Sequence, residues 1–303
     1  MNDLKPALTG REIIEAFKND VEDFFDAAHL FELRFETSGF SPTCIGSGSA
    51  ARIRVPVEML EKSVDSLAEL VLFLLVLGHE TAHYLHRHNE HDDESSLEHR
   101  ALERWADFYG TKVAMIVMTI GQKTLEKMVN FPETKNSGCR LDALACALVV
   151  LSNSYFRVVS EKYPTASERV DTCVSGMLSF FQLQFCLQDG EEGGDEGFER
   201  AMRPETIIKR AFLVQQRLYS NKSLADQSRR SPATDGRSEE IRMIAAVHRK
   251  IQNGQPALFQ GLKEAPSMWL SLDYEIPEDV LAAIAQKKHE LLMSILAEMG
   301  LSE

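Results

Sequence analysis

Positive charge is scarce in this sequence, and the shortage argues against two classes of partner. Among 303 residues there are 33 Lys or Arg and 46 Asp or Glu, so the formal net charge is −13. A protein that binds the phosphate backbone of nucleic acid normally carries a basic excess. Anionic membrane surfaces also attract basic segments. We therefore expect no nucleic-acid partner and no binding to anionic membranes.

Long hydrophobic runs are also missing. The longest apolar stretches cover residues 70–78, 113–120 and 143–151, whereas a membrane-spanning helix needs about 20 apolar residues. Residues 1–14 contain no apolar segment of the kind found in a secretory signal peptide. The five cysteines are irregularly spaced, which is typical of reduced thiols and not of a disulfide framework. We expect a cytoplasmic protein without a membrane span.

Strand signals are scarce as well. Only residues 30–35 and 51–56 alternate between apolar and polar side chains, as a half-buried strand does. They flank a loop rich in Gly and Ser at residues 38–49. Helical periodicity dominates elsewhere and predicts helices over residues 10–27, 57–88, 95–120 and 140–161, and from Pro164 to about 187. The pattern predicts a mainly α (α+β) fold with a small mixed sheet.

An acidic, glycine-rich stretch at residues 188–199 interrupts this pattern. It has six acids, four glycines and no base, a composition typical of a solvated linker. We therefore expect a core at residues 1–187, an acidic linker at 188–199 and a helical C-terminal lobe at 200–303. The helices predicted in that lobe cover residues 204–219, 239–252 and 277–299.

The residues with the clearest chemistry form an H-E-x-x-H motif at His79, Glu80 and His83. On a helix, the two His are four residues apart and project from one face, so both imidazoles can bind one tetrahedral metal ion. Glu80 lies beside them, where it can accept a proton from a metal-activated water. The preceding residues 70–77 are apolar all round, which predicts a buried helix. Buried polar side chains need a partner, and a metal ion supplies one; a solvated His-rich helix end is the alternative.

A catalytic zinc ion usually has three protein ligands and one open position, so a third ligand is required. Glu103 lies twenty residues after His83 in the next helical segment and is the best candidate. Asp107 is four residues further on the same helix face, where it can bind the outer nitrogen of a ligand His and fix its tautomer. Four other acids, in or beside a polar turn that we expect to be exposed, are weaker alternatives: Asp92, Asp93, Glu94 and Glu98.

Other side chains near the motif are less favoured as metal ligands. His86 lies one heptad after His79 and can approach the metal, but such a residue is more often part of the polar surface. His91 and His99 are expected to be solvated. Cys44, in the Gly- and Ser-rich loop, could occupy the open zinc position as a thiolate, and this is the least favoured of these readings.

A third element surrounds Pro164. Hydrolysis of a peptide bond places negative charge on the carbonyl oxygen, which needs a hydrogen-bond donor opposite the metal. The hydroxyl of Tyr163 or the guanidinium of Arg169 can serve as this donor. Thr165 and Glu168 lie between them with the spacing of a capping box, which predicts that a helix begins here.

These motifs resemble those of a known group of enzymes. The H-E-x-x-H segment is similar to the active-site helix of the gluzincin metallopeptidases. The segment that begins at Glu103 resembles the E-x-x-A-D-x-x-G segment of the HtpX-like family (CAAX prenyl protease and Oma-like). The segment that begins at Tyr163 resembles that family's H-P-x-x-x-x-R-I segment, with Tyr163 in place of the usual His. The resemblance covers about residues 45–185. Soluble ImmA/IrrE-like and Lit-like proteases have a similar H-E-x-x-H-Y-L segment and a later Glu.

The resemblance implies a zincin-like core with an active-site helix and one zinc ion per chain, held by His79, His83 and Glu103. It implies Glu80 as the base and hydrolysis of peptide bonds in a protein or peptide substrate. In such folds the substrate usually pairs as an extra strand beside the active-site helix, and residues 52–55 are the expected edge strand. A cytoplasmic protease must be restrained, so we expect narrow specificity or latency, imposed by the C-terminal lobe or a regulatory protein partner.

Two other functions are compatible with the same motifs. A non-catalytic helical regulatory or interaction protein could keep zinc for structure, and Glu80 would then have no chemical role. A zinc hydrolase could also act on a small amide, because the motif carries no information about the size of the substrate.

Overall fold

The apolar run before the H-E-x-x-H motif forms a buried helix. Helix α3 (Leu67–His86) is buried over most of its 20 residues. It begins after Ser66, whose side chain accepts a hydrogen bond from the backbone N–H of Glu69, and ends before Arg87, which has a left-handed backbone (φ 57°). Of the helices in the described ranges, α3 is the one long and apolar enough to cross a membrane, but 72% of its most apolar window is buried inside the protein. It is therefore a core helix.

The computed structural model describes residues 8–29, 31–92, 95–156, 160–181, 236–254, 258–259 and 261–270. Its helices are α1 (Gly10–Asp23), α2 (Val57–Glu61), α3, α4 (Ser96–Ile120), α5 (Gln122–Met128), α6 (Ser137–Ser154), a helix over residues 166–181, α10 (Gly236–Gly254) and α11 (Glu264–Leu270). Its strands are β1 (Leu8–Thr9), β2 (Phe35–Thr37), β3 (Thr43–Ile45), β4 (Arg52–Val55) and β5 (Ser63–Val64).

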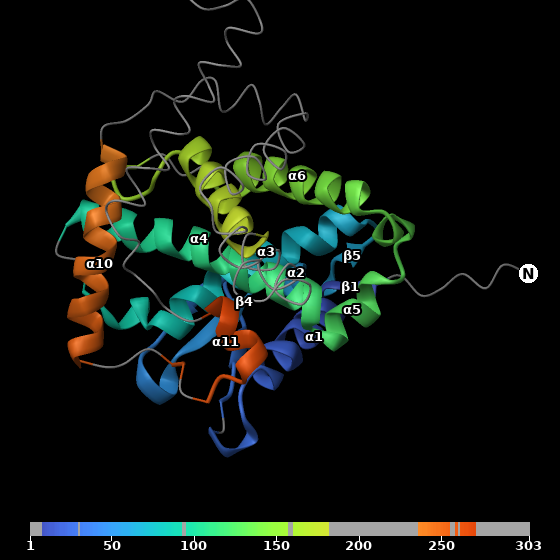
Figure 1. Cartoon of the computed structure of the whole chain (residues 1–303), viewed down its shortest axis with the longest axis horizontal. Helices are drawn as coiled ribbons and strands as arrows, with labels where there is room; N and C mark the ends of the chain where they lie inside the picture. The colour runs from blue at the N-terminus through green and yellow to red at the C-terminus, as the bar shows by residue number, and fades with distance from the viewer. Residues whose placement is uncertain are drawn as a thin grey trace, which may run out of the picture. The chain divides into compact units, whose positions relative to one another are not determined.

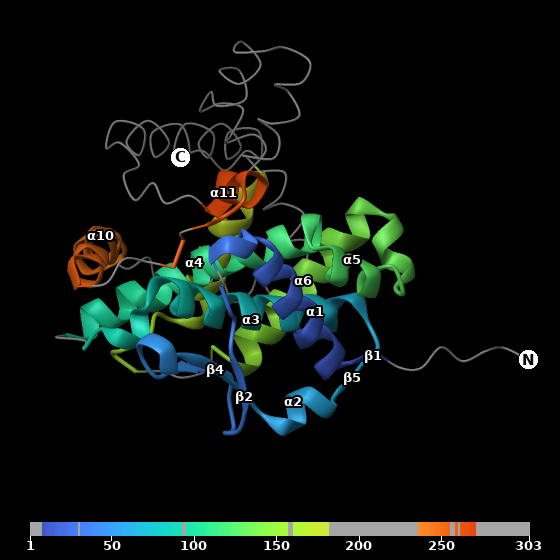
Figure 2. The same cartoon turned by 90° about the horizontal axis from the view of Figure 1, so that it is seen from below.

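The other elements pack around α3. It contacts α4 most extensively, then α6 and α1, and it also contacts β3 and β4. Figure 2 shows β2 and β4 below α3 and α4 above it. The expected fold class, mainly helical with a small mixed sheet, is confirmed.

The three-stranded sheet has the order β2-β4-β3, with β4 parallel to β2 and antiparallel to β3. The prediction that residues 52–55 form an edge strand is therefore wrong, because β4 lies in the centre of the sheet. The alternating pattern indicates that a strand is half buried, but not which neighbours it has. β3 consists of three residues in the Gly- and Ser-rich segment that we expected to be a loop, and it forms one edge.

The helix predicted over residues 57–88 is interrupted. The chain leaves α2 at Lys62, which has an extended backbone (φ −62°, ψ 128°). Residues Ser63 and Val64 then pair with β1 as strand β5. The tertiary partner explains the break, since β1 supplies the backbone hydrogen bonds that a continuous helix would otherwise make within itself. The next helix begins with its own cap at Ser66.

The chain divides into two compact units, Met1–Met177 with Arg217–Ser271 and Leu178–Gln216 with Leu272–Glu303. Part of the segment that we assigned to a C-terminal lobe, including α10 and α11, thus belongs to the unit that contains α3. In that unit α10 packs against α4 (Figure 1). The expected linker at residues 188–199 and the helices predicted over 204–219 and 277–299 lie outside the described residues.

The contact between α3 and α4 depends on two glycines. A Cβ added to Gly78 would overlap the carbonyl oxygen of Gly110, and a Cβ added to Gly110 would overlap the backbone of His79. Both obstacles are backbone atoms, so a rotamer change cannot relieve them. Because neither glycine has a side chain, α3 and α4 can approach closely. The contact lies next to His79, the first His of the motif.

Gly110→Ala is expected to destabilise the protein. Alanine favours a helix over glycine by about 1 kcal/mol, but forcing α3 and α4 apart should outweigh this and leave a net loss of about 1–3 kcal/mol. Urea unfolding followed by circular dichroism measures the change. Cys146→Ala, at an exposed position of α6, is the control for introducing Ala into a helix. Equal stability of Gly110→Ala and wild type would contradict the close contact.

Candidate functional site

His79, His83 and Glu103 lie together where α3 packs against α4. The Nε2 atoms of His79 and His83 are 3.2 Å apart. The two carboxylate oxygens of Glu103 lie 3.6 Å from His79 Nε2 and 3.5 Å from His83 Nε2. Ligand atoms at about 2.0–2.2 Å from one tetrahedral zinc ion are about 3.3–3.6 Å from each other. These three side chains therefore form a group that could hold a metal ion.

The carboxylate of Asp107 lies beside the outer nitrogen of the first His. Its Oδ1 lies 2.9 Å from His79 Nδ1, and its side chain is almost fully buried. A carboxylate at Nδ1 keeps the proton on that nitrogen, so that Nε2 presents its lone pair to the other two side chains. Asp107 is therefore placed as the sequence spacing led us to expect.

Arg169 crosses to this cluster from the helix over residues 166–181. Its guanidinium binds both carboxylate oxygens of Asp107, at 2.8 and 2.9 Å, and lies 3.2 Å from Glu103 Oε2. The ring of Phe156 packs 4.0 Å from the centre of the guanidinium. The predicted capping box is present at the start of this helix, since Thr165 and Glu168 bind each other's backbone N–H. Arg169 thus holds two acids in place at the site.

The neighbouring positive charges favour the ionised forms of Glu103 and Asp107. Burial alone would raise the pKa of Glu103, but the neighbouring His83, His79 and Arg169 hold it well below its usual range. Burial also opposes the ionisation of Asp107, and Arg169 and His79 again keep its pKa low. Burial disfavours the charged form of His79, yet the carboxylates of Asp107 and Glu103 outweigh this effect and raise the pKa of His79. Two ionised carboxylates are thus available at neutral pH.

Glu80 faces strand β3. Its carboxylate accepts a hydrogen bond of 2.6 Å from the backbone N–H of Cys44. Ile53, the partner of Cys44 on β4, donates its own N–H to Arg34 on the β2 side. Cys44 and Ile53 therefore form a non-hydrogen-bonded pair, in which the N–H of Cys44 points to the outer side of the sheet. Glu80 lies at that outer edge.

A cavity of about 440 Å³ opens between these elements. It joins the candidate metal ligands and Glu80 to the edge of β3 and to side chains from α6 and from the segment before residue 166. The residues that line it include Thr43, Cys44, His79, Glu80, His83, Glu103, Tyr155, Phe156, Tyr163 and Arg169. Burial and the nearby carboxylates of Glu80 and Glu90 raise the pKa of the Cys44 thiol above its usual range, which disfavours the thiolate that a metal ligand requires.

Tyr163 lines the same cavity on the side of His99. The two rings meet edge to face, with their centres 5.0 Å apart. The centre of the Arg169 guanidinium lies 6.0 Å from the Tyr163 ring, and Nε2 of His99 is 3.9 Å from Glu103 Oε1. Both residues that we expected to act as oxyanion donors thus lie at the cavity, and Arg169 is bound to the acids of the cluster.

The weaker candidates for the third ligand have other partners or fall outside the described residues. The carboxylate of Glu98 lies 3.2 Å from His91 and accepts a hydrogen bond of 2.6 Å from Lys250. Asp92 is exposed. Asp93 and Glu94 lie outside the described part of the chain.

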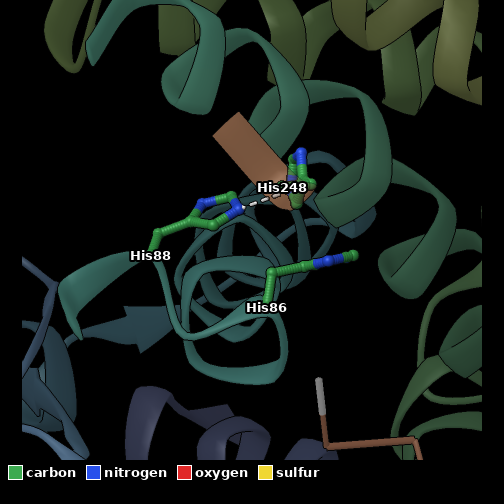
Figure 3. A group of neighbouring side chains, drawn as sticks. All are labelled: His86, His88 and His248. Carbon is green, nitrogen blue, oxygen red and sulfur yellow. Dashed lines mark hydrogen bonds between the residues drawn. The ribbon is translucent and has the colours of Figure 1, made fainter. Parts of the chain in front are cut away.

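A second group of His was missed by the sequence reasoning. His86, His88 and His248 are buried, and their ligand atoms lie within 4.8 Å of one another, so this group could also hold a metal ion. Figure 3 shows the three rings. The expectation that His86 is polar surface is wrong, because its ring packs between Trp105, Tyr109 and Phe259. His248 comes from α10, and no local pattern relates it to the motif.

Comparisons with protein-family models, with curated proteins and with solved structures find no match for this chain. A function can therefore be inferred only from the residues of the site and their geometry.

Proposed function

We propose that this protein is a soluble, cytoplasmic zinc metalloendopeptidase that binds one zinc ion per chain through His79, His83 and Glu103. The observation that carries the proposal is the arrangement of two imidazoles and one carboxylate with 3.2–3.6 Å between their ligand atoms, beside a further carboxylate, Glu80, in one cavity. Nitrogen and carboxylate ligands on three side chains, with a cavity at the fourth position, are typical of a catalytic zinc site.

Glu80 is placed to move protons. Bound zinc would polarise the substrate carbonyl and lower the pKa of the attacking water. Glu80 would take the proton from that water and deliver it to the nitrogen of the leaving amine. Arg169 and Asp107 would hold Glu103 and His79 in their binding orientations, and Tyr163, on the cavity wall, would donate to the oxyanion. Arg169 is the second candidate for that donor, although its guanidinium already binds Asp107 and Glu103.

The substrate would bind as an extended peptide at the outer edge of β3. This strand replaces residues 52–55 as the candidate for substrate pairing, because β3 is an edge of the sheet and lines the cavity. The N–H of Cys44 points outward there and donates to Glu80, so a peptide that pairs with β3 would take this donor over and release the carboxylate of Glu80. A peptide bound along β3 would pass directly beside Glu80.

The alternative is a non-catalytic regulatory or interaction protein with a structural zinc ion. One observation favours it: the carboxylate of Glu80 accepts a hydrogen bond from the backbone of β3, so this side chain has a structural partner that does not depend on catalysis. The two functions differ in whether the proton-accepting ability of Glu80 matters.

Removal of the metal should stop hydrolysis. The purified protein would be incubated with a pool of denatured-protein fragments, and new peptide N-termini would be identified by mass spectrometry. We expect cleavage that disappears after treatment with a chelator and returns when one equivalent of zinc is added. Cleavage that persists in protein shown to be free of metal would contradict the proposal.

A further inference from the structure

A line of hydrogen-bonded imidazoles connects the candidate zinc site to helix α10. Nδ1 of His83 lies 2.9 Å from Nδ1 of His88. Nε2 of His88 lies 3.0 Å from Nε2 of His248, as the dashed line in Figure 3 shows. Nδ1 of His248 lies 2.8 Å from the carbonyl oxygen of Ile244. Three rings and one backbone carbonyl thus form a continuous chain.

The carbonyl at the end of this chain decides the position of every proton in it. A carbonyl only accepts, so His248 must donate from Nδ1, and its Nε2 carries the lone pair, since a neutral imidazole has one donor and one acceptor. His88 must then donate from Nε2 and accept at Nδ1. His83 consequently donates from Nδ1, which leaves the lone pair of its Nε2 directed towards His79 and Glu103. This is the tautomer that a metal ligand bound through Nε2 requires.

The two ligand imidazoles therefore have equivalent outer partners. The carboxylate of Asp107 lies 2.9 Å from Nδ1 of His79, and Nδ1 of His88 forms a hydrogen bond of the same length with Nδ1 of His83. A carboxylate is the common partner for a ligand His. A second His can do the same work only if its own tautomer is set, and His248 sets it.

His86 is close to this chain but has a different partner. Its Nε2 accepts a hydrogen bond of 3.0 Å from the indole N–H of Trp105. That bond uses the lone pair of Nε2 and leaves the proton on Nδ1, so His86 has no second lone pair to offer a metal ion. A metal ion held by His86, His88 and His248 would have to break both this bond and the one between His88 and His248.

Contacts other than His248 hold α10 against α4. Glu240 is buried and binds the guanidinium groups of Arg104 and Arg100. Apolar contacts join Leu102 to Val247 and Ile251. The position of His248 is thus set independently of its bond to His88, and the imidazole chain is preorganised. A single substitution in the chain should therefore remove one hydrogen bond without displacing α10.

We propose that His88 and His248 are positioning residues for the zinc site, forming a histidine relay that holds His83 in the tautomer with the Nε2 lone pair towards the metal. The relay rests on the proposed function, because it presupposes that His83 is a zinc ligand. It also makes α10, which follows His83 by more than 150 residues in the chain, a part of the support of the metal site.

The test measures zinc affinity by competition with a chelator in the full-length protein. His88→Leu removes the acceptor for His83 and is expected to weaken zinc binding about 10–100-fold, as the loss of such an outer partner usually does. His88→Asn should retain most of the affinity, because its side-chain oxygen can take the place of Nδ1. His248→Leu keeps the first bond and should cause a smaller loss than His88→Leu. His86→Gln, which can still accept from Trp105, is the matched control and should bind zinc as wild type does.

Ring-nitrogen NMR shifts of ¹⁵N-histidine-labelled wild type give a second readout that needs no variant. We expect His83 to carry its proton on Nδ1 and His88 on Nε2, also in the metal-free protein under mildly alkaline conditions. Undiminished zinc affinity in a folded His88→Leu, or the opposite tautomers, would overturn the relay. Two zinc ions per wild-type chain, with one lost in His86→Gln, would also overturn the relay and would show instead that His86, His88 and His248 form a second metal site. A wild type that binds no zinc would remove the proposed function, and the NMR shifts would still decide whether the chain of imidazoles exists.

Discussion

Glu80→Gln is expected to lower peptide-bond hydrolysis by about 10²–10⁴-fold, the range that a general acid–base group usually contributes. Glutamine keeps the shape of the side chain and an oxygen that can accept the hydrogen bond from Cys44. It loses only the ability to accept a proton from water. Zinc content and unfolding temperature should therefore remain those of the wild type, while the cleavage products of the peptide pool disappear.

This variant separates the two proposed functions. In a regulatory protein with a structural zinc ion, Glu80 serves only as an acceptor for the backbone of β3, and Gln serves equally well. Wild-type cleavage by a folded, zinc-loaded Glu80→Gln protein would exclude Glu80 as the base. A second variant, Glu80→Ala, removes both the proton acceptor and the acceptor for the backbone N–H of Cys44. If Glu80→Ala is less stable than wild type and Glu80→Gln is not, the difference in stability measures the contribution of that hydrogen bond.

Glu103→Ala is expected to lower zinc affinity by at least about 100-fold, since it removes a direct ligand and even outer partners contribute 10–100-fold. Wild type purified without added metal should contain one zinc ion per chain, and the variant should contain little. The substitution also removes a charge partner of Arg169, but the two bonds from Arg169 to Asp107 remain, so the helix over residues 166–181 should keep its position.

Glu98→Ala is the control for this measurement. Glu98 is another buried acid of α4, and it was a candidate for the third ligand on the basis of sequence alone. In the structure it binds His91 and Lys250, so its removal should leave one zinc ion per chain. Zinc retained in Glu103→Ala and lost in Glu98→Ala would reverse the assignment of the third ligand. Absence of zinc from folded wild type would mean that the H-E-x-x-H motif binds no metal.

Local spacing made a large part of the site predictable. His79 and His83 are four residues apart in a helical run, and Glu103 and Asp107 are four apart in the next one, so each pair was expected to share a helix face. The structure places both pairs at the contact between α3 and α4, with Asp107 on Nδ1 of His79. Gly78 and Gly110 explain why these two helices approach closely enough, a role that no periodicity reveals.

The sheet was less predictable for a physical reason. Alternation along residues 52–55 reflects burial of one face, which a central and an edge strand share. β4 became central because β3, which is only three residues long, pairs with its outer side. The side chains of β3 suit a strand, but three residues between Gly- and Ser-rich stretches are too few to give a clear alternating pattern in the sequence.

By itself, the sequence determined the helical class of the protein, the buried helix α3 and the motif with its two helix faces, because these depend on side chains within a few turns of one another. Only the tertiary structure decided that Glu103 and not Glu98 faces the two His, that Arg169 binds the acids of the site, and that His248 meets His88 across 160 residues. Such contacts depend on how distant helices pack, and the free energy of packing is a property of the assembled core and of no single segment.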